Sequence, residues 1–222
     1  MLRLRTLRLR RLILQHEEAA VVQRQPPPHR LNPQTMILEK SIRLTPNPHW
    51  PIPAQIPKTR VVCRRNHAYA SFQFDVVESD ACFRCQCQND GDPCWQDSCV
   101  EIFVASSDRR AYWNFETNAR ARMLVQFGSS RSERVTLKPE DYAAVRRFEL
   151  IPFTQQPDGM YHWAVQIDIP LEWLGFHDFT PFVGNLYKCA SLARAPHYLA
   201  LFPIDTPDPD FHRPEFFKNI FI

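Results

Sequence analysis

The nine residues YHWAVQIDI, at positions 161–169, decide the fold class. Every odd position of this stretch is apolar, and three of the four even positions are polar. Such alternation predicts a strand with one buried face, because successive side chains of a strand point to opposite faces of the sheet. Similar alternation recurs at 71–76 and at 99–104. Further strands are expected at 82–88, 110–118, 121–127, 147–152, 183–189, 197–201 and 216–222.

Helix is expected only in two short pieces. One begins near Pro139 and continues through Tyr142 to Arg147, and a single turn is expected at 170–175. The chain has 20 prolines and only 5 glycines, which argues against a mostly helical protein because proline breaks helix interiors. Many short, half-buried strands joined by long loops predict an all-β fold, an antiparallel, jelly-roll-like β-sandwich with one or two short helices.

The net charge of +3 is distributed unevenly along the chain. Residues 1–35 hold seven arginines and two glutamates, so this segment carries +5 and residues 36–222 carry −2. A faintly acidic domain does not predict a nucleic-acid partner. No stretch approaches the roughly 20 apolar residues that a membrane helix needs, so membrane insertion is not expected.

The chain is predicted to contain a basic, disordered leader at 1–35, a proline-rich arm at 36–60 and a β-sandwich domain at 61–222. Trp50 lies inside the arm, which suggests that the arm docks on the domain. The leader lacks the apolar core and the cleavage site of a secretory signal. It is interpreted as a transit peptide, a disordered tail, or an over-extended start with Met36 as the true first residue, and the localisation stays open.

The odd number of cysteines argues against a closed disulfide framework. The spacing C-x2-C-x-C-x6-C at 82–94 superficially suggests zinc, but it lacks two C-x2-C pairs separated by about 12–20 residues. Free buried thiols are favoured, with disulfides and zinc as alternatives. Many cysteines without a secretory signal also favour a reducing compartment, and hence the cytoplasm. The seven are Cys63, Cys82, Cys85, Cys87, Cys94, Cys99 and Cys189.

A row of polar side chains is expected along the strand at 112–118. Tyr112, Asn114, Glu116 and Asn118 stand two residues apart and therefore share one face. An aromatic plane with amide and carboxylate groups suits a ligand with apolar faces and many hydroxyls, such as a sugar. The alternative is a solvated sheet face. Two residues of the C-terminal strands are expected to complete the row, Lys188 and His197.

Three residues near position 100 have separate expected roles. Trp95 is either a stacking platform on a loop or a cover for the edge of the sandwich. Asp97 is expected to be structural, because its short side chain can accept hydrogen bonds from backbone N–H groups at the strand entry. Glu101 either points into the binding site or pairs with an arginine.

The C-terminal loop is rich in acidic side chains. Asp208 and Asp210, with His212 and Glu215 nearby, are candidate calcium ligands, since calcium prefers six to eight oxygen ligands. A proline-stiffened loop with solvated acids is the favoured alternative. His212 and Arg213 either reach the ligand or anchor the loop.

Four segments carry a resemblance to a known family. They are WQDSCVEIFV at 95–104, YWNFETN at 112–118, WAVQIDIPLEWLG at 163–175, and the C-terminal run of GNLYKC at 184–189, PHYL at 196–199, PI at 203–204 and PDPDFHRPEFF at 207–217. Taken in order, they resemble the family 9 carbohydrate-binding modules within the wider DOMON-like β-sandwiches. The resemblance covers roughly residues 38–222.

This resemblance implies a sandwich that binds saccharides through aromatic platforms and polar side chains, beside polysaccharide breakdown and without catalysis of its own. Some members hold structural calcium. Cys99 and Cys189 match cysteines of a bacterial subgroup and are expected to lie near each other. The chain departs from the subgroup where Leu201 replaces an aromatic residue, where Lys218 replaces a glycine, and at 120–122, where the usual glycine is missing.

The expected function is therefore a non-catalytic carbohydrate-binding domain with a saccharide as its partner. The alternatives are a degenerate sandwich that serves as a protein-interaction or structural domain, and a metal-binding domain built on the cysteines. Enzyme motifs such as G-x-S-x-G and H-E-x-x-H are absent from the sequence. Glu101 and Glu116 are the types of residue that a glycosidase pairs, but nothing in the sequence shows that they do. No cofactor other than the candidate calcium is expected, and no oligomeric state is predicted.

Overall fold

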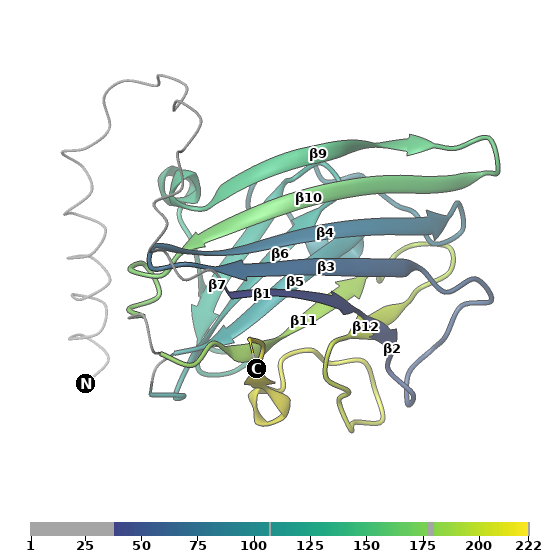
Figure 1. The fold of residues 1–222 in the computed structure, drawn as a ribbon. Helices are drawn as coiled ribbons and strands as arrows, with labels where there is room; N and C mark the ends of the chain where they lie inside the picture. Colours follow the sequence, from purple (N-terminus) through teal and green to yellow (C-terminus); the bar gives the residue numbers. More distant parts are fainter. Residues whose placement is uncertain (1–37, 107, 177–179, 222) are drawn as a thin grey trace, which may run out of the picture. The chain divides into compact units, whose positions relative to one another are not determined.

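The computed structural model describes residues 38–106, 108–176 and 180–221, which form a sandwich of two antiparallel β-sheets (Figure 1). The predicted leader at 1–35 lies outside the described residues. Sheet A contains, in spatial order, β1 (Leu38–Arg43), β3 (Lys58–Arg65), β4 (Tyr69–Ser79), β10 (Met160–Pro170) and β9 (Arg146–Gln155). Sheet B contains β2 (Thr45–Pro46), β12 (Tyr198–Ala200), β11 (Val183–Cys189), β5 (Cys99–Ala105), β6 (Tyr112–Asn118), β7 (Met123–Gly128) and β8 (Arg134–Thr136), with β13 (Lys218–Asn219) paired to β11. The predicted all-β sandwich is confirmed.

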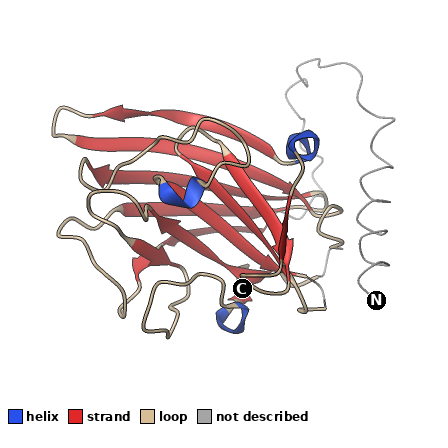
Figure 2. Ribbon diagram, turned by 180° about the vertical axis from the view of Figure 1, so that it is seen from behind, coloured by secondary structure: helices blue, strands red, loops and turns tan. Residues whose placement is uncertain are grey.

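Helix in the described residues is confined to short 3-10 segments, drawn in blue in Figure 2. These are η1 (Cys94–Gln96), η2 (Pro139–Ala144) and η3 (Pro214–Phe216). The helix predicted to reach Arg147 ends at Ala144, because β9 already begins at Arg146. The turn predicted at 170–175 is a turn without helix, and Gly175 has a φ of 69°, a conformation that suits glycine.

The alternating stretch at 161–169 forms the centre of β10. Trp163, Val165 and Ile167 are fully buried and pair in register with Val76, Phe74 and Phe72 of β4, which are also fully buried. Figure 1 shows β10 and β4 side by side in the layer of sheet A, with β5 and β6 in the layer behind. The apolar side chains of the alternating positions therefore form the core of the sandwich.

The prediction of a strand at 82–88 is wrong. This segment begins in a turn, where the amides of Cys82 and Phe83 donate to the carbonyl of Ser79. From residue 84 onward, several of its backbone N–H groups bond to side chains rather than to a neighbouring strand. The amides of Gln86 and Cys87 donate to Asp97 Oδ2 at 2.9 and 2.8 Å, and the amide of Gln88 donates to Asp92 Oδ2 at 3.0 Å. The strand predicted at 216–222 is reduced to the two residues of β13, because η3 occupies its start.

The described part of the proline-rich arm belongs to the sandwich. β1 pairs with β3, and β2 pairs with β12, so residues 38–60 form one compact unit with the predicted domain. Trp50 is buried, and its Nε1 donates to the carbonyl of Thr206 at 2.9 Å. The docking of the arm is confirmed, and the boundary between residues 60 and 61 does not separate two bodies.

Sheet B is buried on both faces at its centre. Every residue of β5, β6 and β11 is buried. One face packs against sheet A, and the other, called here the outer face, carries a second apolar cluster with residues of the 87–94 and C-terminal loops. The outer cluster contains Trp50, Cys87, Cys94, Cys99, Phe103, Ala105, Tyr112, Val183, Tyr187, Cys189, Ala200, Ile204, Phe211 and Phe217.

Candidate functional site

Two carboxyl groups face each other on the outer face of sheet B. Glu101 of β5 pairs in register with Glu116 of β6, and each is 2% exposed. Glu116 Oε1 accepts a hydrogen bond from Asn114 Nδ2 at 2.8 Å. Among the described residues, Glu116 Oε2 has no hydrogen-bond partner although it is buried. The predicted row on β6 therefore exists, but it lies under other residues rather than in solvent.

Burial governs the protonation of this pair. Loss of hydration raises the pKa of Glu116 well above its ordinary value, and the neighbouring Glu101 raises it further. Burial likewise raises the pKa of Glu101, and the contact with Cys189 adds to the rise. Arg134 opposes the rise at both carboxyl groups. The pair therefore holds protons more strongly than free carboxylates do.

A set of half-buried polar side chains lies at the margin of the pair formed by Glu101 and Glu116. Arg134 of β8 donates from NH1 to Gln126 Oε1 at 2.5 Å and lies 3.4 Å from Asn114 Oδ1. The same nitrogen lies 3.3 Å from His212 Nε2, and His212 Nδ1 lies 3.0 Å from the hydroxyl of Tyr112. We call Gln126, Arg134 and His212 the polar rim. It joins the β7–β8 hairpin to the C-terminal loop.

The histidine of the polar rim is neutral. Burial, followed by Arg134 and Arg131, lowers the pKa of His212 to about 3. A neutral ring accepts at one nitrogen and donates at the other, so Nε2 accepts from Arg134 and Nδ1 donates to the Tyr112 hydroxyl. Burial also raises the pKa of Tyr112 to about 12, which keeps its hydroxyl protonated.

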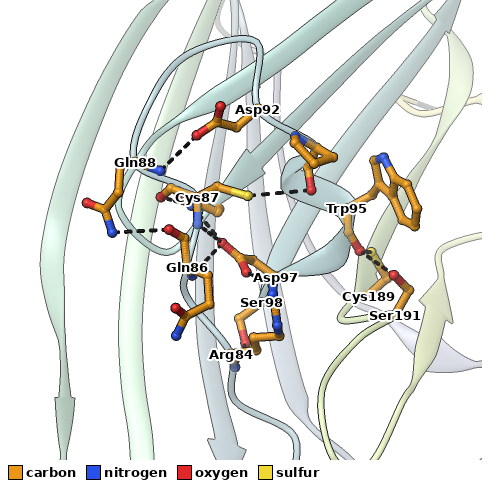
Figure 3. A network of polar contacts seen from close by, with 12 residues as sticks. Arg84, Gln86, Cys87, Gln88, Asp92, Trp95, Asp97, Ser98, Cys189 and Ser191 are labelled. Carbon is orange, nitrogen blue, oxygen red and sulfur yellow. Dashed lines mark hydrogen bonds and ion pairs between the residues drawn. The ribbon is translucent and has the colours of Figure 1, made fainter.

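Trp95 lies in η1, and 41% of its surface is exposed. Its carbonyl is held by side chains from the end of β11 and beyond, because it accepts from Cys189 Sγ at 3.3 Å and from Ser191 Oγ at 3.1 Å (Figure 3). The main chain of Trp95 is therefore fixed to sheet B while a large part of its ring remains accessible.

Asp97 organises the loop that carries Trp95, as Figure 3 shows. Besides the two amides at its Oδ2, the carboxylate accepts from Arg84 through Oδ1. Asn118 Nδ2 donates to Asp97 Oδ2 at 3.2 Å and to the carbonyl of Cys87 at 3.1 Å, while its Oδ1 accepts from two backbone amides. The structural role of Asp97 is confirmed. Asn118, which was expected to touch ligand, has its side chain occupied by the loop.

Lys188 and His197 do not join the row on β6. In the register of β5 and β11, Lys188 is opposite Val100, whereas Glu101 is opposite Tyr187, so Lys188 points to the inner face. Its Nζ donates to Glu78 Oε2 of sheet A at 2.9 Å and to His197 Nε2 at 2.8 Å. Burial and Lys188 lower the pKa of His197 to about 2. Both residues belong to the interior between the sheets.

The C-terminal acids do not gather into a metal site. Asp210 Oδ1 accepts from the amide of His212 at 3.0 Å and lies 3.5 Å from an Arg131 nitrogen. Among the described residues, neither Asp208 nor Asp210 belongs to a group of three or more His, Cys, Asp or Glu side chains close enough to share a metal ion. Arg213 lies 3.6 Å from Glu215 and 3.9 Å from Asp210. These contacts fit the alternative in which the loop is anchored by its own charges.

The seven cysteines are buried, and none of them forms a disulfide bond. The proposed zinc spacing at 82–94 is not assembled: the thiols of Cys82, Cys87 and Cys94 each donate to a different backbone carbonyl. Cys99 and Cys189 are opposite each other in register, as expected.

Sequence reasoning missed Gln126 and Arg134. They lie outside the motifs, and the only available signal was alternation along 121–127, which places Gln126 on the same face as Leu124.

No helix of the described residues is long and apolar enough to cross a membrane.

The chain is similar to known proteins. The family model described as carbohydrate-binding family 9 matches residues 40–222. Among solved structures, the chain is similar to a "putative carbohydrate-binding protein" from Bacteroides uniformis ATCC 8492, with 28% identity and a TM-score of 0.69 over 80% of this chain and 84% of that chain. A family 9 module from Caldicellulosiruptor kristjanssonii in complex with cellotriose is 12% identical, with a TM-score of 0.41 over 66% of each chain, which is too distant for any transfer of its ligand. The curated proteins gave no match.

Proposed function

This chain belongs to carbohydrate-binding family 9, and we propose that it is a non-catalytic module that binds a saccharide at the polar rim and Trp95. The membership agrees with the resemblance carried by the four sequence segments. It does not favour the alternatives of a structural domain or a metal-binding domain built on the 82–94 cysteines. The similarity to the Bacteroides uniformis protein, whose name describes it as carbohydrate-binding, supports the same class of ligand.

The polar rim is the main observation that supports the position of the proposed site. Gln126, Arg134 and His212 are half-buried and already held in one hydrogen-bonded set. Together they present amide, guanidinium and imidazole groups, which can donate to and accept from the hydroxyl groups of a sugar. Asn114 and Glu116 lie beneath them and fix their orientation.

Trp95 supplies the apolar part of the proposed site. A sugar ring has C–H faces that pack on an exposed aromatic plane, and Trp95 offers such a plane on a loop whose main chain is fixed. The hydroxyl-binding groups come from β7, β8 and the C-terminal loop, and the stacking group comes from η1. Contact with ligand by Glu101 or by Tyr112, which are buried, would require movement of the side chains that cover them.

Titration calorimetry of the full chain against a panel of mono- and oligosaccharides tests the proposal. Gln126→Ala and Trp95→Ala should each weaken binding at least about tenfold, which corresponds to about 1.4 kcal/mol. Gln73→Ala is the matched control, because Gln73 is a half-buried glutamine on β4 of sheet A. The proposed site would be refuted if the unmodified chain bound no saccharide. It would also be refuted if Gln73→Ala and Gln126→Ala lost equal affinity.

A further inference from the structure

Beneath Trp95 lies a cluster of groups that the proposed saccharide site does not use. Cys99 of β5 is opposite Cys189 of β11, and Glu101 stands two residues after Cys99 on the same face. The two thiol sulfurs and a carboxylate oxygen of Glu101 all lie within 4.8 Å of one another. All three residues are buried. No other group of three or more such ligands is present in the described parts of the chain.

The hydrogen bonds of this cluster leave it poorly satisfied. Cys189 Sγ is 3.0 Å from Glu101 Oε1 and 3.3 Å from the carbonyl of Trp95, so one S–H serves two acceptors. Cys99 Sγ lies 3.6 Å from the carbonyl of Val100, its neighbour in sequence, and interacts with the thiol of Cys189. Thiols are weak donors, and a buried carboxyl normally has stronger partners.

A second observation concerns the carboxyl group opposite Glu101 in register. The backbone N–H of Trp95 acts on the Glu116 carboxyl group, yet its buried Oε2 has no hydrogen bond of good geometry among the described residues. An unsatisfied buried oxygen is costly and calls for an ion, a water molecule or a ligand. Arg134 is the positive side chain that acts on both carboxyl groups, and it is already bonded to Gln126.

The donor set has the chemistry of a zinc site. Zinc binds thiolate sulfur at about 2.3 Å and carboxylate oxygen at about 2.0–2.2 Å in tetrahedral geometry. Sulfur and oxygen atoms bound to one zinc ion are therefore about 3.6–3.8 Å apart. Cys189 Sγ and Glu101 Oε1, which are 3.0 Å apart, would separate by about 0.6 Å, and the other distances would shorten by at most about 1.2 Å. Two sulfurs favour a soft or borderline cation over calcium or magnesium.

We propose that Cys99, Cys189 and Glu101 bind one zinc ion, and that Glu116, whose oxygens lie outside this 4.8 Å group, moves toward the ion as the fourth ligand. Binding would release the protons of the two thiols and replace the hydrogen bond between Cys189 and Glu101 by metal–ligand bonds. The ion would join β5, β6 and β11 directly below the loop that carries Trp95, whose carbonyl is 3.3 Å from Cys189 Sγ. The zinc site would share Glu116 with the layer beneath the polar rim, so the ion would support the saccharide site from below.

The metal is tested on the full chain without any saccharide, so that failure of this proposal leaves the proposed function untouched. Protein stripped with a chelator is titrated with Zn²⁺ and, separately, with Co²⁺, whose thiolate-to-metal charge-transfer absorption reports sulfur ligands. We expect one equivalent of tightly held zinc after dialysis and a cobalt spectrum with this absorption.

Variants locate the metal. Cys99→Ser and Cys189→Ser should each abolish stoichiometric zinc and reduce the cobalt–thiolate absorption, and Glu116→Gln should weaken zinc at least about tenfold. Cys63→Ser is the matched control, because Cys63 is a buried thiol of β3 in sheet A. Cys87→Ser tests the spacing at 82–94.

Three results would overturn the proposal. The first is less than about one tenth of an equivalent of zinc in the unmodified chain. The second is zinc retained in both Cys99→Ser and Cys189→Ser, and the third is zinc lost in Cys87→Ser. Far-ultraviolet circular dichroism accompanies each variant. If a serine variant does not fold, the unmodified chain with Cys63→Ser and Glu116→Gln still decides, since Gln keeps the size of the side chain.

Discussion

Replacing Lys188 by methionine tests the polar network between the two sheets. Methionine keeps a long, flexible apolar stem and removes the ammonium group. Lys188 Nζ is fully buried and donates to Glu78 Oε2 at 2.9 Å, to the carbonyl of Cys189 at 2.9 Å and to His197 Nε2 at 2.8 Å. Without it, the Glu78 carboxylate keeps the indole N–H of Trp163, which is 2.7 Å from Oε1. The variant therefore leaves a buried charge without its counter-ion.

The expected loss is large for a single substitution. Removing one partner of a buried ion pair costs about 3–5 kcal/mol of unfolding free energy. In a domain of this size each kcal/mol lowers the melting temperature by about 2–4 °C, so the shift should be about 6–20 °C. The double variant Lys188→Met/Glu78→Gln removes the uncompensated charge as well. It should recover about half of the loss or more.

Urea unfolding followed by circular dichroism and tryptophan fluorescence measures both variants. Lys58→Met is the control, because Lys58 is an exposed lysine of β3, and its effect should stay within about 0.5 kcal/mol. A loss below about 1 kcal/mol for Lys188→Met would refute the reasoning. So would a double variant as unstable as the sum of its two single variants.

Two further predictions concern the loops over sheet B. The pKa of His212 is lowered to about 3, so the stability that its neutral ring contributes is complete above its ordinary value of 6.5 and is lost as the pH falls toward 3. The His212→Asn variant lacks this titrating ring. Between pH 5.5 and 3.5, its unfolding free energy should therefore change less steeply with pH than that of the unmodified chain, by up to about 1.4 kcal/mol per pH unit. Equal pH slopes of the two proteins in urea unfolding would contradict this prediction. Asp97→Ala should cost at least about 2 kcal/mol, since it leaves two backbone N–H groups unsatisfied, whereas Asp92→Ala, which removes a carboxylate of the same loop that accepts from two exposed amides, should cost less than about 1 kcal/mol in the same assay.

The strands at the centre of the sandwich could be predicted because their side chains alternate. At 161–169 the pattern alone predicts a strand and its buried face, and both are present in the structure. At 82–88 the sequence shows apolar residues of strand type, but a carboxylate more than eight residues away in the chain captures the amides. Alternation cannot reveal such a competitor for backbone hydrogen bonds, because the competitor is brought close only by the fold.

The site was harder to predict for a related reason. β5, β6 and β11 are buried on both faces, so hydrophobicity does not tell which face of a central strand points to the core. Lys188 and Glu101 are both buried and polar, yet the register puts them on opposite faces. Gln126 and Arg134 come from a hairpin without a motif, and only the closing of the C-terminal loop brings His212 to them.

The docking of the arm near the start of the sandwich has a consequence for the order in which the molecule is completed. Asn47 Nδ2 donates to the carbonyl of Ile204, and Trp50 Nε1 donates to the carbonyl of Thr206, across more than 150 residues in each case. A growing chain cannot form these contacts until residues 204 and 206 have left the ribosome, and contacts of such long sequence separation form slowly. The loop that holds His212 is therefore seated after most strands of both sheets have been made, so a chain cut short before Ile204 would keep those strands and still lack His212 of the polar rim.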